Sequence, residues 1–129
     1  MDHAVVMAGG SGTRFWPESR PRRAKQFLDL TGGGPMVRET ILRLIPVIPP
    51  ERVWVVAGRK DAPHLSPRSL GIPKANILLE PEGKNTAPAV AYAVARIVRR
   101  DPDAVVLATP SDHAIADVRK FRAVIRKGL

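Results

Sequence analysis

Four short apolar runs recur along the chain, at residues 4–8, 53–57, 77–79 and 104–108. Each run is continuous rather than alternating. A continuous run is typical of a strand buried on both faces of a parallel sheet, whereas alternation is typical of a strand with one face in solvent. The pattern therefore predicts four buried strands of a mainly parallel sheet.

Helical periodicity fills the stretches between the apolar runs. A first helix is expected to begin near Pro35. A second is expected where Asn85 or Thr86 can act as the N-cap and Pro88 falls in the first turn. A last helix is expected after Asp117, which can cap it. The apolar faces predicted for the three helices are, in order, Val37, Ile41, Leu44 and Ile45; Ala87, Val90, Ala91, Val94, Ile97 and Val98; and Val118, Phe121, Val124 and Ile125.

The alternation of strands and helices predicts an α/β fold with three layers, α/β/α, built on a Rossmann-like and mainly parallel sheet with right-handed crossovers. The 129 residues suit a single domain, and no internal repeat or linker divides them. Ligands of such sheets bind beyond the carboxyl ends of the strands. A binding site is therefore expected among the loops that follow Ala8, Ala57, Leu79 and Ala108.

Composition narrows the possible chemistry. The chain contains no cysteine, which excludes disulfides, thiolate metal sites and thiol nucleophiles. A formal charge of +9 favours anionic ligands, and on charge alone phosphates, nucleic acid and acidic lipid all stay open. No apolar run approaches the roughly 18 residues of a membrane-spanning helix, and the first residues lack the basic segment of a signal peptide. We therefore expect a cytoplasmic protein without a membrane partner.

The loop after the first predicted strand is rich in glycine and reads GGSGTR at residues 9–14. Glycines allow positive φ and close approach of the backbone to a ligand, so successive amides there can bind a phosphate. A dinucleotide-binding fingerprint fails because Phe15 stands where the third glycine belongs and Pro17 follows. A P-loop fails because the internal Gly-Lys at 83–84 is followed by Asn85. A longer phosphate-binding loop remains, and a solvated basic loop is the alternative interpretation.

Two other loops carry groups suited to a nucleotide and a cation. Glu80 and Asn85 combine a carboxylate and an amide at a strand end and a helix start, where they can hydrogen-bond a base or a ribose. Helix capping is the alternative role for Asn85. Asp112 follows the last predicted strand, a position suited to Mg²⁺, which takes one or two carboxylates together with phosphates and waters. A turn-forming aspartate is the alternative there, and His113 can orient it or contact a substrate.

Three further features have plainer interpretations. The basic side of the last predicted helix could suit a membrane surface or RNA, but a solvated face of a helix that covers the sheet explains it more simply. Trp54 lies in a buried-strand pattern and is expected in the core. No partner is predicted for His64.

Taken in order, three motifs closely resemble the sugar nucleotidyltransferase family, and within it the mannose-1-phosphate guanylyltransferases. They are GSGTRFWPESR with the later KQFL, at residues 10–20 and 25–28; EPEGKNTAPA, at residues 80–89; and PSDH, at residues 110–113. The resemblance spans nearly the whole chain, and three ordered motifs are far more specific than any one of them.

The resemblance implies a reaction. In this family a sugar 1-phosphate oxygen attacks the α-phosphorus of GTP in line and pyrophosphate leaves, which here implies Mg²⁺-dependent formation of GDP-mannose from GTP and mannose 1-phosphate. Arg14 and Lys25 would stabilise the phosphates, and Asp112 would hold Mg²⁺; these three residues form the implied catalytic set. The implied nucleotide-binding set is Ala8, Gly9, Gly10, Ser11, Gly12, Thr13, Glu80, Pro81, Gly83 and Asn85.

The chain departs from the family pattern in two respects. Ala24 stands where the family has proline before the signature lysine, which leaves Lys25 less fixed. Members of the family are also far longer, so residues 1–129 are expected to be the nucleotide-binding part, with the sugar-binding part and a C-terminal region absent. For such a truncated sheet we expect an uncovered edge or apolar face, with self-association or dependence on the missing portion.

Two alternative functions stay open. The first is a non-catalytic module that binds nucleotides or other anions, and the second is a nucleotidyltransferase that uses another sugar 1-phosphate. Specific recognition of nucleic acid is not expected, because the chain lacks the interleaved aromatic residues on which single-strand binders stack bases.

Overall fold

The computed structural model describes residues 1–10, 24–30, 32–82 and 85–129, and over them it forms a parallel sheet with the strand order β3-β2-β1-β4. The strands are β1 (Asp2–Met7), β2 (Val53–Gly58), β3 (Ile77–Glu80) and β4 (Val105–Pro110). All the pairings, β1 with β2, β1 with β4 and β2 with β3, are parallel. The predicted sheet is therefore confirmed.

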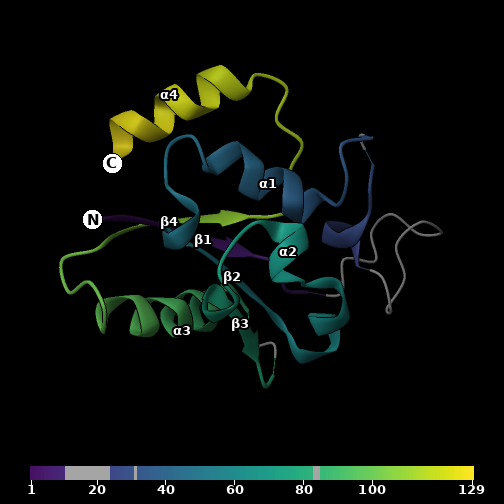
Figure 1. The fold of residues 1–129 in the computed structure, drawn as a ribbon, viewed down its shortest axis with the longest axis horizontal. Helices are drawn as coiled ribbons and strands as arrows, with labels where there is room; N and C mark the ends of the chain where they lie inside the picture. The colour runs from purple at the N-terminus through teal and green to yellow at the C-terminus, as the bar shows by residue number, and fades with distance from the viewer. Residues whose placement is uncertain (11–23, 31, 83–84) are drawn as a thin grey trace.

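Helices cover both faces of this sheet, as Figure 1 shows. The α-helices are α1 (Met36–Leu44), α2 (Pro67–Leu70), α3 (Thr86–Val98) and α4 (Val118–Gly128), and short 3-10 helices span Lys25–Phe27, Pro50–Arg52, Arg59–His64 and Lys74–Asn76. In Figure 1, α1 and the yellow α4 lie on one side of the strands and the green α3 on the other. The three-layer α/β/α architecture predicted from the sequence is confirmed.

Two apolar cores follow from the alternation of side chains along the strands. On the α1 side, Val6 of β1 and Val55 of β2 pack in one cluster with Ile41. On the α3 side, Val5 and Trp54 pack in another with residues of that helix. The cores fix both faces of the sheet and leave the carboxyl ends of the strands as its open end.

Helix α3 buries a different stripe from the one expected. Its buried residues are Ala89, Ala93 and Ile97, which lie four residues apart on one face, whereas Ala91 is exposed and Val98 is 43% exposed. The helix is apolar on most sides, so apolar content alone did not identify the buried face. Two alanines on the packing face let the helix approach the strands closely.

The outer strand and helix are less buried than predicted. β4 pairs only with β1 among the described strands, its residues are exposed or partly exposed, and Val105 keeps 47% of its surface in solvent. In α4, Ile125 is buried but Val124 is 62% exposed. The Asp117 cap is confirmed, because its carboxylate accepts the Lys120 amide at 2.9 Å. An uncovered edge is thus present at β4, and self-association stays a prediction.

Two aromatic predictions have opposite outcomes. Trp54 is 2% exposed, which confirms its place in the core. His64, for which no partner was predicted, stacks on Phe27 with ring centroids 5.0 Å apart. No helix within the described residues is long and apolar enough to cross a membrane.

Candidate functional site

Two adjoining hollows open at the carboxyl ends of β1, β2 and β3. Their volumes are about 420 and 450 Å³, and they share Gly9, Gly10 and Glu80 as lining residues. The first is also lined by residues that follow β2, and the second by the start of α3. The hollows therefore lie where the sequence predicted a ligand, beyond the strand ends of a doubly covered parallel sheet.

Glu80 is the carboxylate at the centre of these hollows. It is the last residue of β3 and only 8% exposed, and burial raises its pKa. A Cβ added at Gly9 would stand 3.8 Å from its Oε2 atom. The bare glycine backbone thus leaves room beside the carboxylate for a ligand group.

Two backbone conformations shape the walls of the site. Gly10 has φ of 99°, in the region that favours glycine, so the turn after β1 depends on this residue. Asn85 also has positive φ, 74°, and occupies the N-cap position of α3 without a side-chain capping bond. The predicted N-cap position is thus confirmed at Asn85, but the capping hydrogen bond from its side chain is not formed. Because its amide is not used as a cap, it can serve the hollow that it lines.

Two buried side chains attach distant segments to the end of β1. Gln26 is 3% exposed and donates from Nε2 to the carbonyl of Ala8 at 3.0 Å. Ser111 is 2% exposed and donates from Oγ to the carbonyl of Met7 at 2.8 Å. Their neighbours in sequence are Lys25 and Asp112, so each hydrogen bond places one predicted catalytic residue.

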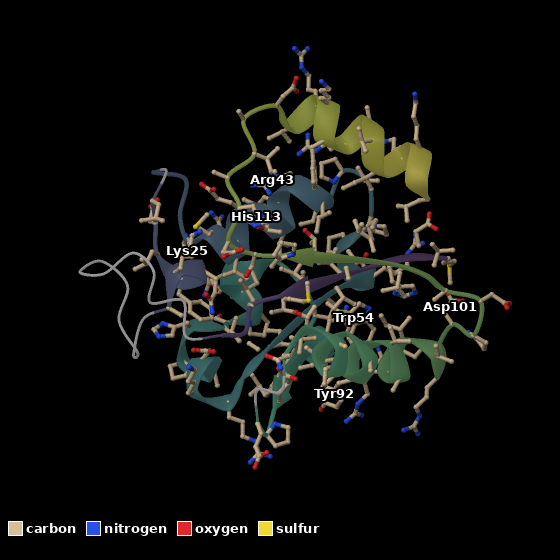
Figure 2. The ribbon with its side chains drawn as sticks, turned by 180° about the vertical axis from the view of Figure 1, so that it is seen from behind. Lys25, Arg43, Trp54, Tyr92, Asp101 and His113 are labelled. Atoms are coloured by element: carbon tan, nitrogen blue, oxygen red, sulfur yellow. The ribbon has the colours of Figure 1, made fainter. Side chains whose placement is uncertain are left out.

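Lys25 and Asp112 meet at this end of the sheet. Lys25 Nζ lies 3.7 Å from Asp112 Oδ2, and His113 Nε2 lies 3.6 Å from Asp112 Oδ1. The Lys25 side chain is 18% exposed and that of Asp112 is 39% exposed, so the pair is open to a ligand. Figure 2 shows Lys25 and His113 on the same side of the molecule. A lysine and an aspartate far apart in the sequence thus form one charged pair.

Arg43 on α1 braces the segment that contains Asp112. Its Nη2 donates to the carbonyl of His113 at 3.4 Å, and its guanidinium lies 5.5 Å from the ring centroid of Phe121 on α4. Burial lowers the pKa of Arg43; Glu39 opposes this shift and the positive charge of Arg122 adds to it. This brace was not predicted from the sequence, where Arg43 appears as a polar residue between apolar helix positions.

The loop after β2 supplies site residues that sequence reasoning missed. Arg59, Lys60 and Asp61 line one hollow together with Glu80. Burial raises the pKa of Asp61, which is 4% exposed, although Lys60, His64 and the Gly58 backbone favour its charged form. The Oδ2 atom of Asp61 is buried and has no hydrogen-bond partner among the residues that the structure describes. Their position directly after a buried strand was the available signal.

Part of the predicted site lies outside the described residues. The predicted site residues that the structure does not describe are Ser11, Gly12, Thr13, Arg14 and Gly83. Of the other predicted residues, Gly9, Gly10, Glu80, Pro81 and Asn85 line the two hollows, Ala8 is buried beside them, and Lys25 and Asp112 form the charged pair. Within the described ranges, no group of three or more His, Cys, Asp or Glu side chains is placed to hold a metal.

Comparison with known proteins identifies relatives over nearly the whole chain. The family model described as "Nucleotidyl transferase" matches residues 3–128. The chain is 42% identical over 124 residues to the xanthan biosynthesis protein XanB of Xanthomonas campestris pv. campestris (strain B100), covering 94% of this chain and 26% of that protein. It is 39% identical over 137 residues to a mannose-1-phosphate guanylyltransferase of Escherichia coli (strain K12), covering 98% of this chain and 27% of that protein.

A solved structure agrees in both fold and sequence. The crystal structure described as mannose-1-phosphate geranyltransferase from Thermus thermophilus superposes with a TM-score of 0.86 and 37% identity. The match covers 98% of this chain and 36% of that one. The present chain thus spans about a quarter of the length of the curated relatives it matches.

Proposed function

Because this chain belongs to the nucleotidyl transferase family, we propose that it is the nucleotide-binding part of an enzyme that transfers GMP from GTP to mannose 1-phosphate, giving GDP-mannose and pyrophosphate. The observation that carries the proposal is the convergence of Lys25 and Asp112, 3.7 Å apart, beside the strand ends that also bear Gly9, Gly10 and Glu80. A cation, a carboxylate and a glycine turn together suit a nucleoside triphosphate better than a simple anion.

The proposed reaction needs positioning and charge neutralisation rather than a protein nucleophile. The sugar 1-phosphate oxygen attacks the α-phosphorus, the bond from that phosphorus to the bridging oxygen breaks, and pyrophosphate leaves. Lys25, with Arg14, would neutralise the negative charge that builds up on the transferring and leaving phosphates. The amides of the turn at Gly10 would bind the same phosphates through their N–H groups.

Asp112 is suited to hold Mg²⁺ in this site. Its carboxylate is 39% exposed and lies at the open end of the sheet, and the described residues form no group of three or more His, Cys, Asp or Glu side chains that could make a closed metal cage. Such a donor set fits an ion that takes one or two carboxylates and completes its shell with phosphate oxygens and waters. Bound there, Mg²⁺ would supply charge neutralisation at the phosphates.

The nucleoside is proposed to occupy the two hollows beside Glu80. Glu80 can accept hydrogen bonds from N–H or O–H groups of a base or ribose, and Asn85 can both donate and accept. Guanine and mannose 1-phosphate are proposed from the relatives' names, since one similar protein is called a mannose-1-phosphate guanylyltransferase. Another sugar 1-phosphate is the alternative substrate.

Thermal denaturation with ligands tests this proposal. GTP with Mg²⁺ should raise the Tm of the chain, and Asp112→Ala should lose the part of the shift that depends on Mg²⁺. Asp103→Ala is the matched control, because Asp103 is an exposed aspartate in a different turn. If saturating GTP leaves the Tm unmoved with and without Mg²⁺, the site assignment is wrong.

Competition separates this proposal from a module that binds anions by charge alone. At moderate salt, GTP should displace a bound fluorescent GTP analogue at lower concentration than ATP or UTP. A charge-driven site should instead rank the three nucleotides equally and weaken steeply as salt rises. Equal ranking would favour the non-catalytic module.

A further inference from the structure

Another hollow lies at the other end of the sheet from the two hollows of the candidate site. It encloses about 330 Å³. Its lining residues are Trp54, Ala75, Leu78, Arg96, Arg99 and Arg100. Helix α3 begins beside the candidate site, where Thr86 lines a hollow, and its opposite end carries the arginines. In Figure 2, Trp54 lies away from Lys25 and His113 and toward Asp101.

Two of the three arginines rest on aromatic rings. The Arg100 guanidinium lies 5.2 Å from the ring centroid of Trp54, and that of Arg96 lies 5.7 Å from the ring centroid of Tyr92. Ring contacts of this kind hold a guanidinium by its face and leave its five N–H donors in the plane available. Within the described parts of the chain, the guanidinium groups of Arg96, Arg99 and Arg100 donate no hydrogen bond and form no ion pair.

Several arginines elsewhere in the described residues do have acceptors within the protein. Arg38 donates to the carbonyl of Ser69, and Arg52 to that of Asp2. Arg122 and Arg126 donate to carbonyls at and just beyond the end of α1. Those arginines bind the protein's own backbone, whereas the three that line the hollow are exposed and have no acceptor among the described residues.

Local negative charge does not balance the cluster. The carboxyl end of a helix is equivalent to about half a negative charge, against the three positive charges of Arg96, Arg99 and Arg100. The nearest carboxylate in sequence, Asp101, lies 2.9 Å from the N-terminal amine and 3.2 Å from His3 Nε2. A net excess of positive charge therefore stays in one concave surface.

We propose that this hollow binds a small phosphate-bearing molecule with two or more negative charges, of which inorganic pyrophosphate is the simplest. Its volume falls at the lower end of small-molecule sites. Planar guanidiniums bind phosphate oxygens in pairs, so three of them in one hollow fit more than one phosphoryl group. Trp54 is 2% exposed, which leaves no open ring for the base stacking that a single-stranded nucleic acid would use.

Fluorescence of Trp54 gives a local readout. The chain has two tryptophans, Trp16 and Trp54, so the Trp16→Phe variant reports on the hollow alone. In a Mg²⁺-free buffer, pyrophosphate should change Trp54 emission saturably, because an anion bound to the Arg100 guanidinium would lie beside the indole. Inorganic phosphate should act at higher concentration. The response should persist when Lys25→Ala is added, since Lys25 belongs to the other site.

Paired charge changes test the arginines. Arg96→Gln with Arg99→Gln removes two charges and should weaken pyrophosphate binding at least about tenfold, the effect of losing charged hydrogen bonds. Arg119→Gln with Lys120→Gln, two exposed positions on α4, removes the same charge and should change the affinity less than about twofold. Arg100 is kept because it packs on Trp54.

Three results would overturn the inference. They are the absence of a saturable Trp54 response, equal weakening by both double variants, and binding of a single-stranded DNA oligonucleotide as tight as that of pyrophosphate at moderate salt. None of these depends on GTP binding, so the test is independent of the proposed function.

Discussion

Replacing Gln26 with methionine tests how the lysine segment is attached to the sheet. Gln26 is 3% exposed and donates to the carbonyl of Ala8, a residue that is fully buried, at 3.0 Å. Methionine has a similar volume and no N–H donor, so Gln26→Met removes the hydrogen bond while filling the space. The variant isolates one bond in the site.

The expected loss of stability follows from this burial. Losing a buried hydrogen bond costs about 1 kcal/mol, and up to about 3 kcal/mol if the Ala8 carbonyl is left without a donor. For a chain of this size each kcal/mol lowers Tm by roughly 3 to 5 °C, so Gln26→Met should melt about 3 to 15 °C below the parent chain. Lys25 is the adjacent residue, so the Tm gain from GTP and Mg²⁺ should also shrink.

Calorimetry with and without GTP measures both effects. Ser69→Ala is the control, since the Ser69 hydroxyl donates to the carbonyl of Ser66 at 3.0 Å but is exposed to solvent. It should change stability by less than about 0.5 kcal/mol. If Gln26→Met has the same Tm as Ser69→Ala, the hydrogen bond does not stabilise the fold. If Gln26→Met has a lower Tm but keeps the full Tm shift from GTP, the hydrogen bond does not position Lys25.

Three other substitutions, the last with a matched control, test two carboxylates with shifted pKa values and the α3 core. Burial raises the pKa of Glu80 above its ordinary value of 4.5, so the charged carboxylate destabilises the fold above that pH. Glu80→Gln should therefore raise Tm at pH 7 and lose that gain below pH 4.5. It should also reduce the Tm shift caused by GTP. The N-terminal amine is the largest cause of a lowered pKa at Asp101; partial desolvation opposes the shift and His3 adds to it. Asp101→Asn should therefore lower Tm at pH 7, and the difference in Tm should fade as the pH falls below 3.8. Ile97→Ala, at a fully buried position, should cost about 2 to 5 kcal/mol in urea unfolding, whereas Val98→Ala, at one 43% exposed, should cost less than about 0.5 kcal/mol.

The sequence was sufficient for the sheet because each strand is a local signal. Continuous apolar runs identify buried strands, and strand ends identify the loops that hold Glu80 and Asp112. Gln26 and Ser111 could not be found in this way. Their hydrogen bonds join residues 18 and 104 positions apart, and such a bond depends on how segments meet after folding.

The α3 stripe was misassigned for a related reason. A helix that is apolar on most sides carries no clear local signal for which face packs on the sheet. Tertiary packing selected the face that holds Ala89, Ala93 and Ile97. The charged loop after β2, by contrast, follows a predicted buried strand. That position alone was enough to predict Arg59, Lys60 and Asp61 as candidate site residues.

The basic side of α4 does more than keep that helix in solvent. Arg122 donates from Nε to the carbonyl of Arg43 at 2.9 Å, and Arg126 donates to that of Pro46 at 3.3 Å. Carbonyls at the end of a helix lack partners within it, so cationic donors stabilise that end and join the two helices. Arg43 in turn donates to the carbonyl of His113. Ser111 therefore attaches the segment that carries Asp112 to β1, and Arg43 attaches it to α1. The following helix, α4, buries little apolar surface, and the hydrogen bonds of Arg122 and Arg126 hold it in place. Replacing Arg122 and Arg126 should thus loosen the segment that carries Asp112, although neither arginine lines the hollows of the candidate site.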